Sequence, residues 1–432
     1  MSASKLVEKK YLLPFVLVTS LFALWGFAND ITNPMVAAFG TIMEISNARS
    51  ALVQFAFYGG YATMAIPAAL FIRKFSYKKG IILGLSLYAL GALLFIPAAH
   101  FEVFGFFLVS LYILTFGLAF LETTANPYIL SMGDTASSTR RLNLAQSFNP
   151  LGSIFGMFVA ANFILASLQS DLRDSSGQLL FDGMNAAEKA LVRTHDLAVI
   201  RDPYVALGLF VIAMIVLFVV VKMPNTRSDD PKSSAWSSFR RLYNNRVYRQ
   251  GVVAQLFYVG VQIMCWTFII HYAESIGLSK AEAQRYNMVA MGLFIAFRFF
   301  STFLMRYVSA QKLLMFFALG GMLTTLGTIF IGGMPGLYSL VATSAFMSLM
   351  FPTIYGISLE GVGEDTTLGA AGLVMAIVGG ALMPPLQGIL VDLDSVLGLP
   401  AVNFSFVLPF VCFAVVARFG YTTAGTKNYT TR

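Results

Sequence analysis

The chain has 432 residues, of which 57% are hydrophobic and only 12% are charged. This balance excludes an ordinary soluble globular protein, in which about 25% of residues are charged. The net charge of +8 does not indicate a nucleic-acid partner, because the basic residues collect in short loops between apolar runs, as the positive-inside rule describes for membrane proteins.

Apolar stretches of about 18 residues or more recur along the chain and predict membrane-spanning helices. No small-residue cleavage site follows the first stretch, so we expect a retained span and not a removed signal peptide. Cys265 and Cys412 both lie inside such stretches, so we expect buried thiols and no disulfide. We predict twelve spans, at residues 11–38, 48–74, 79–99, 103–132, 139–168, 202–223, 246–275, 283–306, 310–332, 336–359, 366–391 and 401–421.

The loops after the second, fourth and sixth spans are rich in lysine and arginine, and so are both termini. Arg140 and Arg141 form the basic loop after the fourth span. An even number of spans requires both termini to lie on one side of the membrane. The charge bias predicts that this side is the cytoplasm.

Two longer polar segments divide the apolar runs. Residues 169–201 predict an outer loop in which residues 186–199 form a short surface helix, and residues 224–245 predict a cytoplasmic linker. Short matches recur on either side of this linker at one offset: Arg73, Phe75, Ser76 and Lys79 match Arg306, Val308, Ser309 and Lys312. We therefore predict an all-α membrane protein with two pseudo-symmetric six-helix halves, 1–223 and 246–432, which is the architecture of major facilitator transporters.

Two carboxylic acids lie inside predicted spans. Glu122 lies within the fourth span and Asp30 lies late in the first. A charged side chain at the bilayer centre costs about 2.5–3.5 kcal/mol or more, so such an acid is by default a functional candidate. We predict that Asp30 and Glu122 couple proton movement to transport, with Asp30 toward the outer side. Glu122 is expected about 13 Å from the inner end of its helix, at 1.5 Å per residue.

Amide and aromatic side chains share faces with these acids, or recur at spacings of three and four in other spans. Amides suit a sugar because they both donate and accept hydrogen bonds with hydroxyl groups, and an aromatic ring can pack against the apolar face of a pyranose. The residues predicted to bind the sugar are Trp25, Asn29, Asn33, Asn126, Asn143, Gln146, Gln255, Tyr258, Gln262 and Trp266.

Each of these residues also has a structural interpretation. Amides in membrane helices often hydrogen-bond neighbouring helices, and Trp266 can be a core residue. Arg298 can be satisfied by carbonyls at helix ends or by one of the acids Glu360, Glu364 and Asp365. We expect no metal or cofactor, because the histidines are scattered, and no enzyme, because no nucleophile–base pair is evident.

Three motifs are more specific than the general pattern. They are Leu121-Glu-Thr-Thr-Ala-Asn-Pro-Tyr128, Arg141-Leu-Asn-Leu-Ala-Gln-Ser-Phe-Asn149 and Ala254-Gln-Leu-Phe-Tyr-Val-Gly-Val-Gln-Ile-Met-Cys-Trp266. With these motifs the chain resembles the L-fucose–proton symporter (fucose permease) family of the major facilitator superfamily over nearly its whole length. The resemblance implies a sugar–proton symporter of the bacterial inner membrane, with Glu122 and Gln146 in its central site.

The chain departs from this family in its first helix. The family's acid usually falls where this chain has Asn33, whereas here the carboxylate is at Asp30, one turn earlier. Because the family also includes glucose and galactose carriers, the substrate is expected to be L-fucose or another hexose. A sugar sensor that does not transport and a proton–drug antiporter are the other candidates. The expected partners are a small sugar, protons and the lipid bilayer, and the expected state is a monomer.

Overall fold

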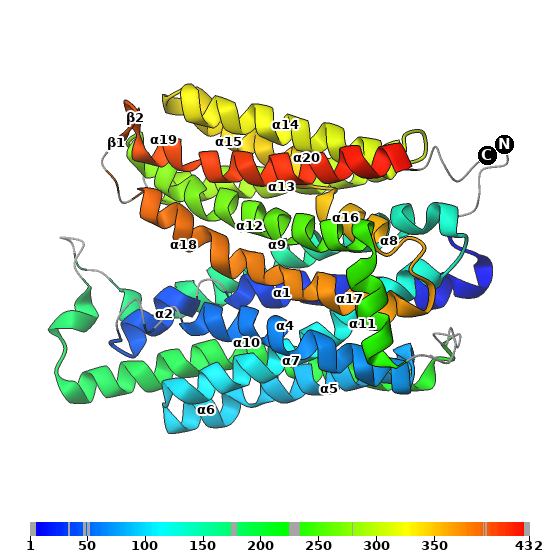
Figure 1. The fold of residues 1–432 in the computed structure, drawn as a ribbon. Helices are drawn as coiled ribbons and strands as arrows, with labels where there is room; N and C mark the ends of the chain where they lie inside the picture. The colour runs from blue at the N-terminus through cyan, green and yellow to red at the C-terminus, as the bar shows by residue number, and fades with distance from the viewer. Residues whose placement is uncertain are drawn as a thin grey trace. The chain divides into compact units, whose positions relative to one another are not determined.

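The computed structural model describes residues 6–32, 35–45, 49, 52–172, 174, 179–223, 234–278, 280–391, 393 and 395–426. Within these residues, twelve helical segments are long and apolar enough to cross a membrane (Figure 1). This confirms the predicted number of spans and the helical membrane class. Large apolar side chains such as Phe55, Leu209 and Leu323 remain exposed, as expected for helices that face lipid.

The chain forms two compact units, and each combines segments that are distant in the sequence. The amino-terminal unit contains the described residues of Val16–Ala125 and Phe148–Arg227. The carboxyl-terminal unit contains those of Met1–Phe15, Asn126–Ser147 and Ser228–Arg432. Residues 126–147 thus pack with carboxyl-terminal helices, although the predicted halves assign them to the first half. The division into 1–223 and 246–432 stays a prediction.

The amino-terminal unit is built from membrane-length helices and several shorter ones. Its helices are α1 (Leu12–Thr32), α2 (Met35–Ile42), α4 (Leu52–Lys74), α5 (Tyr77–Leu93), α6 (Phe95–Phe101), α7 (Phe104–Ser131), α9 (Asn149–Val159) and α10 (Ala186–Val220), with the first turn of α1 and the last of α7 in the other unit. A π-helical turn, Ala160–Ile164, follows α9. The predicted surface helix at 186–199 is helical but is continuous with the sixth span. A capping box between Asn185 and Glu188 begins α10, and Pro203 lies inside the helix without ending it.

Ring stacking, a hydrogen bond and close backbone packing join helices of the amino-terminal unit. The Phe95 ring stacks on Tyr204 of α10 with centroids 3.9 Å apart, and the Tyr204 hydroxyl hydrogen-bonds the Thr32 hydroxyl at 2.8 Å. Helices α1 and α9 meet backbone to backbone at glycines. A methyl group at Gly26 would lie 1.9 Å from the Asn149 carbonyl oxygen, so only hydrogen fits there.

The carboxyl-terminal unit is organised around α12. Its helices are α8 (Ser138–Gln146), α11 (Ala235–Asn244), α12 (Arg246–Ser275), α13 (Lys280–Leu304), α14 (Ala310–Phe330), α15 (Gly333–Met347), α16 (Met350–Ser358), α17 (Thr366–Met375), α18 (Gly379–Val391), α19 (Ala401–Ser405) and α20 (Val407–Thr426). Helix α12 packs against α13, α16, α18 and α20, while α14 packs against α15 and α20. The strands β1 (Ser395–Val396) and β2 (Leu399–Pro400) form a short antiparallel hairpin before α19.

Several spans are interrupted. Helix α8 ends at Gln146, α15 ends at Met347, and a 3₁₀ turn at Ala376–Val378 separates α17 from α18. Pro150, at the start of α9, cannot supply a backbone N–H to continue the preceding helix. Each interruption leaves carbonyl groups that need partners, and such broken helices are where transporters place their polar sites.

Arg141 differs from the sequence-based expectation. The sequence predicts that Arg141 lies in a basic loop, but the structure shows its side chain fully buried. Its guanidinium donates to the carbonyls of Ile129 at 2.8 Å and Leu130 at 2.6 Å, at the end of α7. The last carbonyls of a helix lack partners within that helix, so Arg141 acts as a cap for α7.

The predicted linker is also more ordered than expected. Residues 235–244 of the predicted segment 224–245 form helix α11, while residues 224–233 lie outside the described residues. The Ser234 hydroxyl accepts the Trp236 backbone N–H at 3.3 Å and so caps the start of this helix.

Candidate functional site

Helix α1 carries one predicted row of site residues in the amino-terminal unit. Trp25 and Asp30 are buried, and Asn29 is half-buried. Asn33, the fourth member of the row, lies outside the described residues. The Trp25 ring meets Phe22 edge-on with centroids 4.4 Å apart. Its buried Nε1–H has no hydrogen-bond partner among the described residues, so it can donate to a bound hydroxyl.

The two predicted proton-coupling acids lie on different helices of this unit. Asp30 lies on α1 and is 7% exposed, and Glu122 lies on α7 and is half-buried. Helix α7 continues unbroken through Pro127. Two buried tyrosines of α4 accompany the acids, since Tyr58 interacts electrostatically with Asp30 and Tyr61 with Glu122. These tyrosines are not among the residues predicted from the sequence, although their spacing of three within an apolar span places them on one helical face.

In the carboxyl-terminal unit, Asn126 and Gln146 lie together. The Gln146 side-chain amide donates to the Asn126 Oδ1 at 2.8 Å, which joins the end of α7 to the end of α8. Both side chains are buried. Two residues that were selected on separate spans therefore form one hydrogen-bonded pair.

Arg298 lies beside this pair on α13. Its guanidinium donates to the Gln146 carbonyl at 3.1 Å and, through Nε, to the Ser348 carbonyl. It also lies over the Phe294 ring, 4.6 Å from the centroid. Gln146 ends α8 and Ser348 follows α15, so Arg298 satisfies carbonyls at two helix interruptions, where the helix dipole favours a cation.

This arrangement confirms one of the two structural interpretations of Arg298. Its partners are carbonyls at helix ends. The carboxylate of Asp365, the other kind of partner considered, instead accepts two hydrogen bonds from Arg241, both at 2.7 Å.

Asn143 hydrogen-bonds to its own helix and to a neighbouring helix. Its amide nitrogen donates to the Thr139 carbonyl at 2.9 Å and to the Thr353 hydroxyl at 3.2 Å, which links α8 to α16. The buried Oδ1 has no hydrogen-bond partner within the described part of the chain. Asn143 therefore holds two helices together and keeps one acceptor available.

Helix α12 carries the other predicted row of site residues, and these residues differ in their burial and in their hydrogen-bond partners. Tyr258 donates to the Met347 carbonyl at 3.0 Å, and Trp266 donates to the Ser344 hydroxyl at 3.2 Å. Gln262 is half-buried. Gln255 is fully buried, yet neither atom of its amide has a partner among the residues described. A buried polar group without a partner costs about 1–3 kcal/mol, so Gln255 is the residue of this row with the most to gain from hydrogen bonds to a bound sugar.

The comparisons with known proteins agree with this architecture. Residues 17–384 match the sequence profile of the Major Facilitator Superfamily. The chain belongs to the major facilitator superfamily. It is thus a multi-pass membrane transporter.

Two curated relatives in this superfamily are named as L-fucose–proton symporters. That of Haemophilus influenzae is 63% identical over 97% of this chain and 98% of its own length. That of Escherichia coli is 36% identical over 96% of this chain and 95% of its own. The crystal structure of the transporter FucP in the outward conformation superposes with a TM-score of 0.87 at 34% identity, covering 96% of this chain and 99% of that one. These likenesses confirm the family indicated by the motifs.

Proposed function

We propose that this protein imports L-fucose together with protons by alternating access. The observation that supports this most strongly is the 63% identity to the Haemophilus influenzae L-fucose–proton symporter across both chains. It is supported independently by acids inside two membrane helices and by the buried amide of Gln255, which has no hydrogen-bond partner among the described residues. On this proposal the protein is a transporter and not an enzyme.

Asp30 and Glu122 are the proposed proton-coupling groups. Both lie within membrane-length helices of the amino-terminal unit, and both have a buried tyrosine in electrostatic range. A carboxyl in such a place can hold a proton while the site faces one side and release it when the site faces the other. Importing a neutral sugar with a proton then uses the proton gradient to accumulate the sugar.

The proposed sugar contacts include two kinds of group with distinct hydrogen-bonding roles. Trp25 and Gln255 contribute buried donors or acceptors that have no partner among the described residues. Asn126 and Gln146 contribute a preorganised amide pair. Asn29, Asn33, Asn143, Tyr258, Gln262 and Trp266 complete the proposed set. A site built to hydrogen-bond hydroxyls rejects analogues that lack them, because its buried groups are then left unpaired.

The orientation and location are part of the same proposal. The excess of lysine and arginine in the loops and termini favours a cytoplasmic location for both ends, and the bacterial relatives favour the inner membrane. We further propose that the protein is a monomer in the bilayer. Its two halves, 1–223 and 246–432, move about the site, and residues 224–245 connect them.

Uptake into proteoliposomes tests the function directly. Vesicles with an imposed inward proton gradient, offered labelled L-fucose, D-glucose, D-galactose and D-mannitol separately, should accumulate L-fucose above the external concentration. Collapse of the gradient with a protonophore should abolish accumulation but leave exchange. Accumulation of glucose or galactose but not of fucose would show that the substrate is that hexose and not L-fucose. Failure to accumulate any sugar with the gradient in place would overturn the symport proposal.

A further inference from the structure

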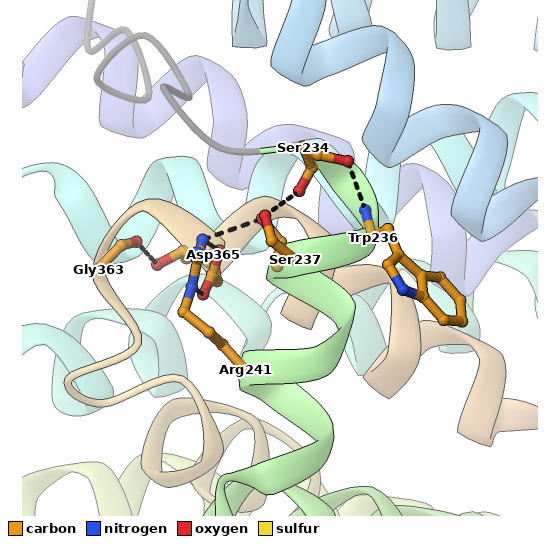
Figure 2. A network of polar contacts seen from close by, with 8 residues as sticks. Ser234, Trp236, Ser237, Arg241, Gly363 and Asp365 are labelled. Carbon is orange, nitrogen blue, oxygen red and sulfur yellow. Dashed lines mark hydrogen bonds and ion pairs between the residues drawn. The ribbon is translucent and has the colours of Figure 1, made fainter.

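Helix α11 is not part of the candidate transport site, yet its side chains are sharply divided between two faces. One face is held to the carboxyl-terminal unit. Ser238 and Leu242 are buried, and the Arg241 guanidinium makes its paired bonds to Asp365 while also donating to the Ser238 hydroxyl at 3.2 Å (Figure 2). A two-bond arginine–carboxylate pair fixes orientation as well as position, so α11 is a docked helix.

The other face of α11 is an exposed aromatic stripe made of Trp236, Phe239 and Tyr243. These side chains are 73%, 50% and 59% exposed. Their spacing of three and four places them on one helical face, and their rings are nearly parallel, with successive centroids 5.8 and 6.4 Å apart. Three exposed aromatic rings in register are unusual for a surface in contact with water only.

Exposed cations border the aromatic stripe. Arg240, Arg246 and Arg249 are all exposed, and the Arg249 guanidinium lies 5.4 Å from the centroid of the Tyr243 ring. Aromatic rings with flanking arginines are the side chains that helices at a membrane surface present to lipid headgroups.

The chain itself fixes how far α11 can lie from the bilayer. It ends at Asn244, and α12, which is long and apolar enough to cross a membrane, begins at Arg246. Only Asn245 separates them. Figure 1 shows α11 running across the direction of α12 within the carboxyl-terminal unit. A helix attached by one residue to the end of a span, and lying across it, must lie at the level where that span enters the membrane.

From these observations we propose that α11 is an interfacial anchor that binds anionic phospholipid. The aromatic stripe enters the headgroup region of the leaflet in which α12 begins, and Arg240, Arg246 and Arg249 bind lipid phosphate groups. The Arg241–Asp365 pair transmits this attachment to α17. The anchor thus fixes the height of the carboxyl-terminal unit relative to the bilayer surface.

Trp236 provides the readout for the test. The purified full-length protein is reconstituted into vesicles of zwitterionic lipid brominated close to the headgroup, with or without about 30% anionic phosphatidylglycerol. The difference in emission between the wild type and Trp236→Phe isolates Trp236 from Trp25 and Trp266. We expect brominated lipid to reduce this difference emission roughly two-fold when anionic lipid is present, as for a ring in the headgroup region, and water-soluble iodide to have little effect.

The variants separate the two parts of the site. Phe239→Ser with Tyr243→Ser should release Trp236 from lipid quenching, and Arg240→Gln with Arg246→Gln and Arg249→Gln should remove the dependence on anionic lipid. Arg285→Gln, an exposed arginine on α13, is the matched control and should change neither. Trp236 emission that is quenched by iodide and not by brominated lipid would overturn the anchor, as would protection from both quenchers, which indicates a protein contact. Quenching independent of anionic lipid would overturn the role of the arginines.

Discussion

Glu122 and Asp30 are alike in that each carboxyl group lies in a membrane helix, where a charge is costly. A carboxyl differs from an amide of the same shape in one relevant respect, which is that it can release a proton. Substitution by the amide therefore separates proton coupling from sugar binding, since the amide still donates and accepts hydrogen bonds.

For Glu122→Gln we expect sugar exchange across the membrane to persist and uphill accumulation to be lost. Exchange needs the site to bind the sugar and to change its facing side, while accumulation also needs the proton. The measurement is counterflow of labelled L-fucose beside gradient-driven uptake in the same proteoliposomes. Accumulation at the wild-type level would show that Glu122 is not a coupling acid.

The second prediction concerns the exchanged acid and amide in the first helix. Asp30→Asn should abolish proton-driven uptake. Combined with Asn33→Asp, this change moves the acid to the position that the family resemblance indicates, and it should recover part of the uptake, because the two positions are only three residues apart in the sequence. Initial uptake rates with an imposed gradient compare the single and double variants. Wild-type uptake by the single variant would make Asp30 a structural carboxyl.

Arg298 joins two interrupted spans, because it donates to the carbonyls of Gln146 and Ser348. Arg298→Met should leave the Gln146 and Ser348 carbonyls without this donor, at about 1–3 kcal/mol for each unpaired buried group, and should lower the thermal midpoint in detergent. Arg298→Lys should fall between, because an ammonium lacks the planar fork of donors. Arg285→Met on the same helix is exposed and serves as the control. Equal thermal midpoints for Arg298→Met and Arg285→Met would show that Arg298 does not stabilise the fold.

Glu44 joins the segment after α2 to α10 by a different kind of contact. It accepts hydrogen bonds from Lys189 at 2.6 Å and Arg193 at 3.0 Å. The hydrogen bond from Lys189, followed by the charges of the two basic residues, holds the pKa of Glu44 below its ordinary value. A lowered pKa in the folded state means that the stabilisation is present above the ordinary pKa of about 4.3 and is lost as the pH falls through the lowered value.

We therefore expect Glu44→Gln to melt below the wild type at neutral pH, and this difference to shrink as the pH falls below 4.3 or so. The effect should be small and should weaken with salt, because the pair is partly exposed. Glu102→Gln is the control, since Glu102 accepts its hydrogen bond from the neutral hydroxyl of Thr194. A difference that grows on acidification would contradict the assignment.

Elements were predictable from the sequence where hydropathy alone decides them. The twelve spans follow from the length of apolar runs. The continuity of α10 was not predicted, because its first turns carry charged residues, which indicate a surface helix separate from the apolar span that follows. The burial of Arg141 was not predicted either, since most of its partners are backbone carbonyl groups, which every residue carries and no sequence pattern marks.

The contacts among the candidate site residues could not be predicted from the sequence. The helical spacing identified Asn126 and Gln146 separately, and only the structure shows that they bond each other. It also shows residues 126–147 packed with carboxyl-terminal helices, through Arg298 to Gln146 and Asn143 to Thr353. If the predicted halves rock apart during transport, these are bonds that must break, because each joins one predicted half to the other.

The glycine contact between α1 and α9 has a practical consequence for following such motion. At Gly152, as at Gly26, a methyl group would lie within 2 Å or so of a carbonyl oxygen on the neighbouring helix, so the two backbones cannot slide without a clash. Spin labels at the exposed positions Val16 and Ile154 should therefore report one distance by double electron–electron resonance, with or without L-fucose and at any proton concentration. This label pair would serve as an internal reference of constant distance for label pairs on moving helices. A distance distribution that shifts when sugar is added would show that α1 and α9 separate during the transport cycle.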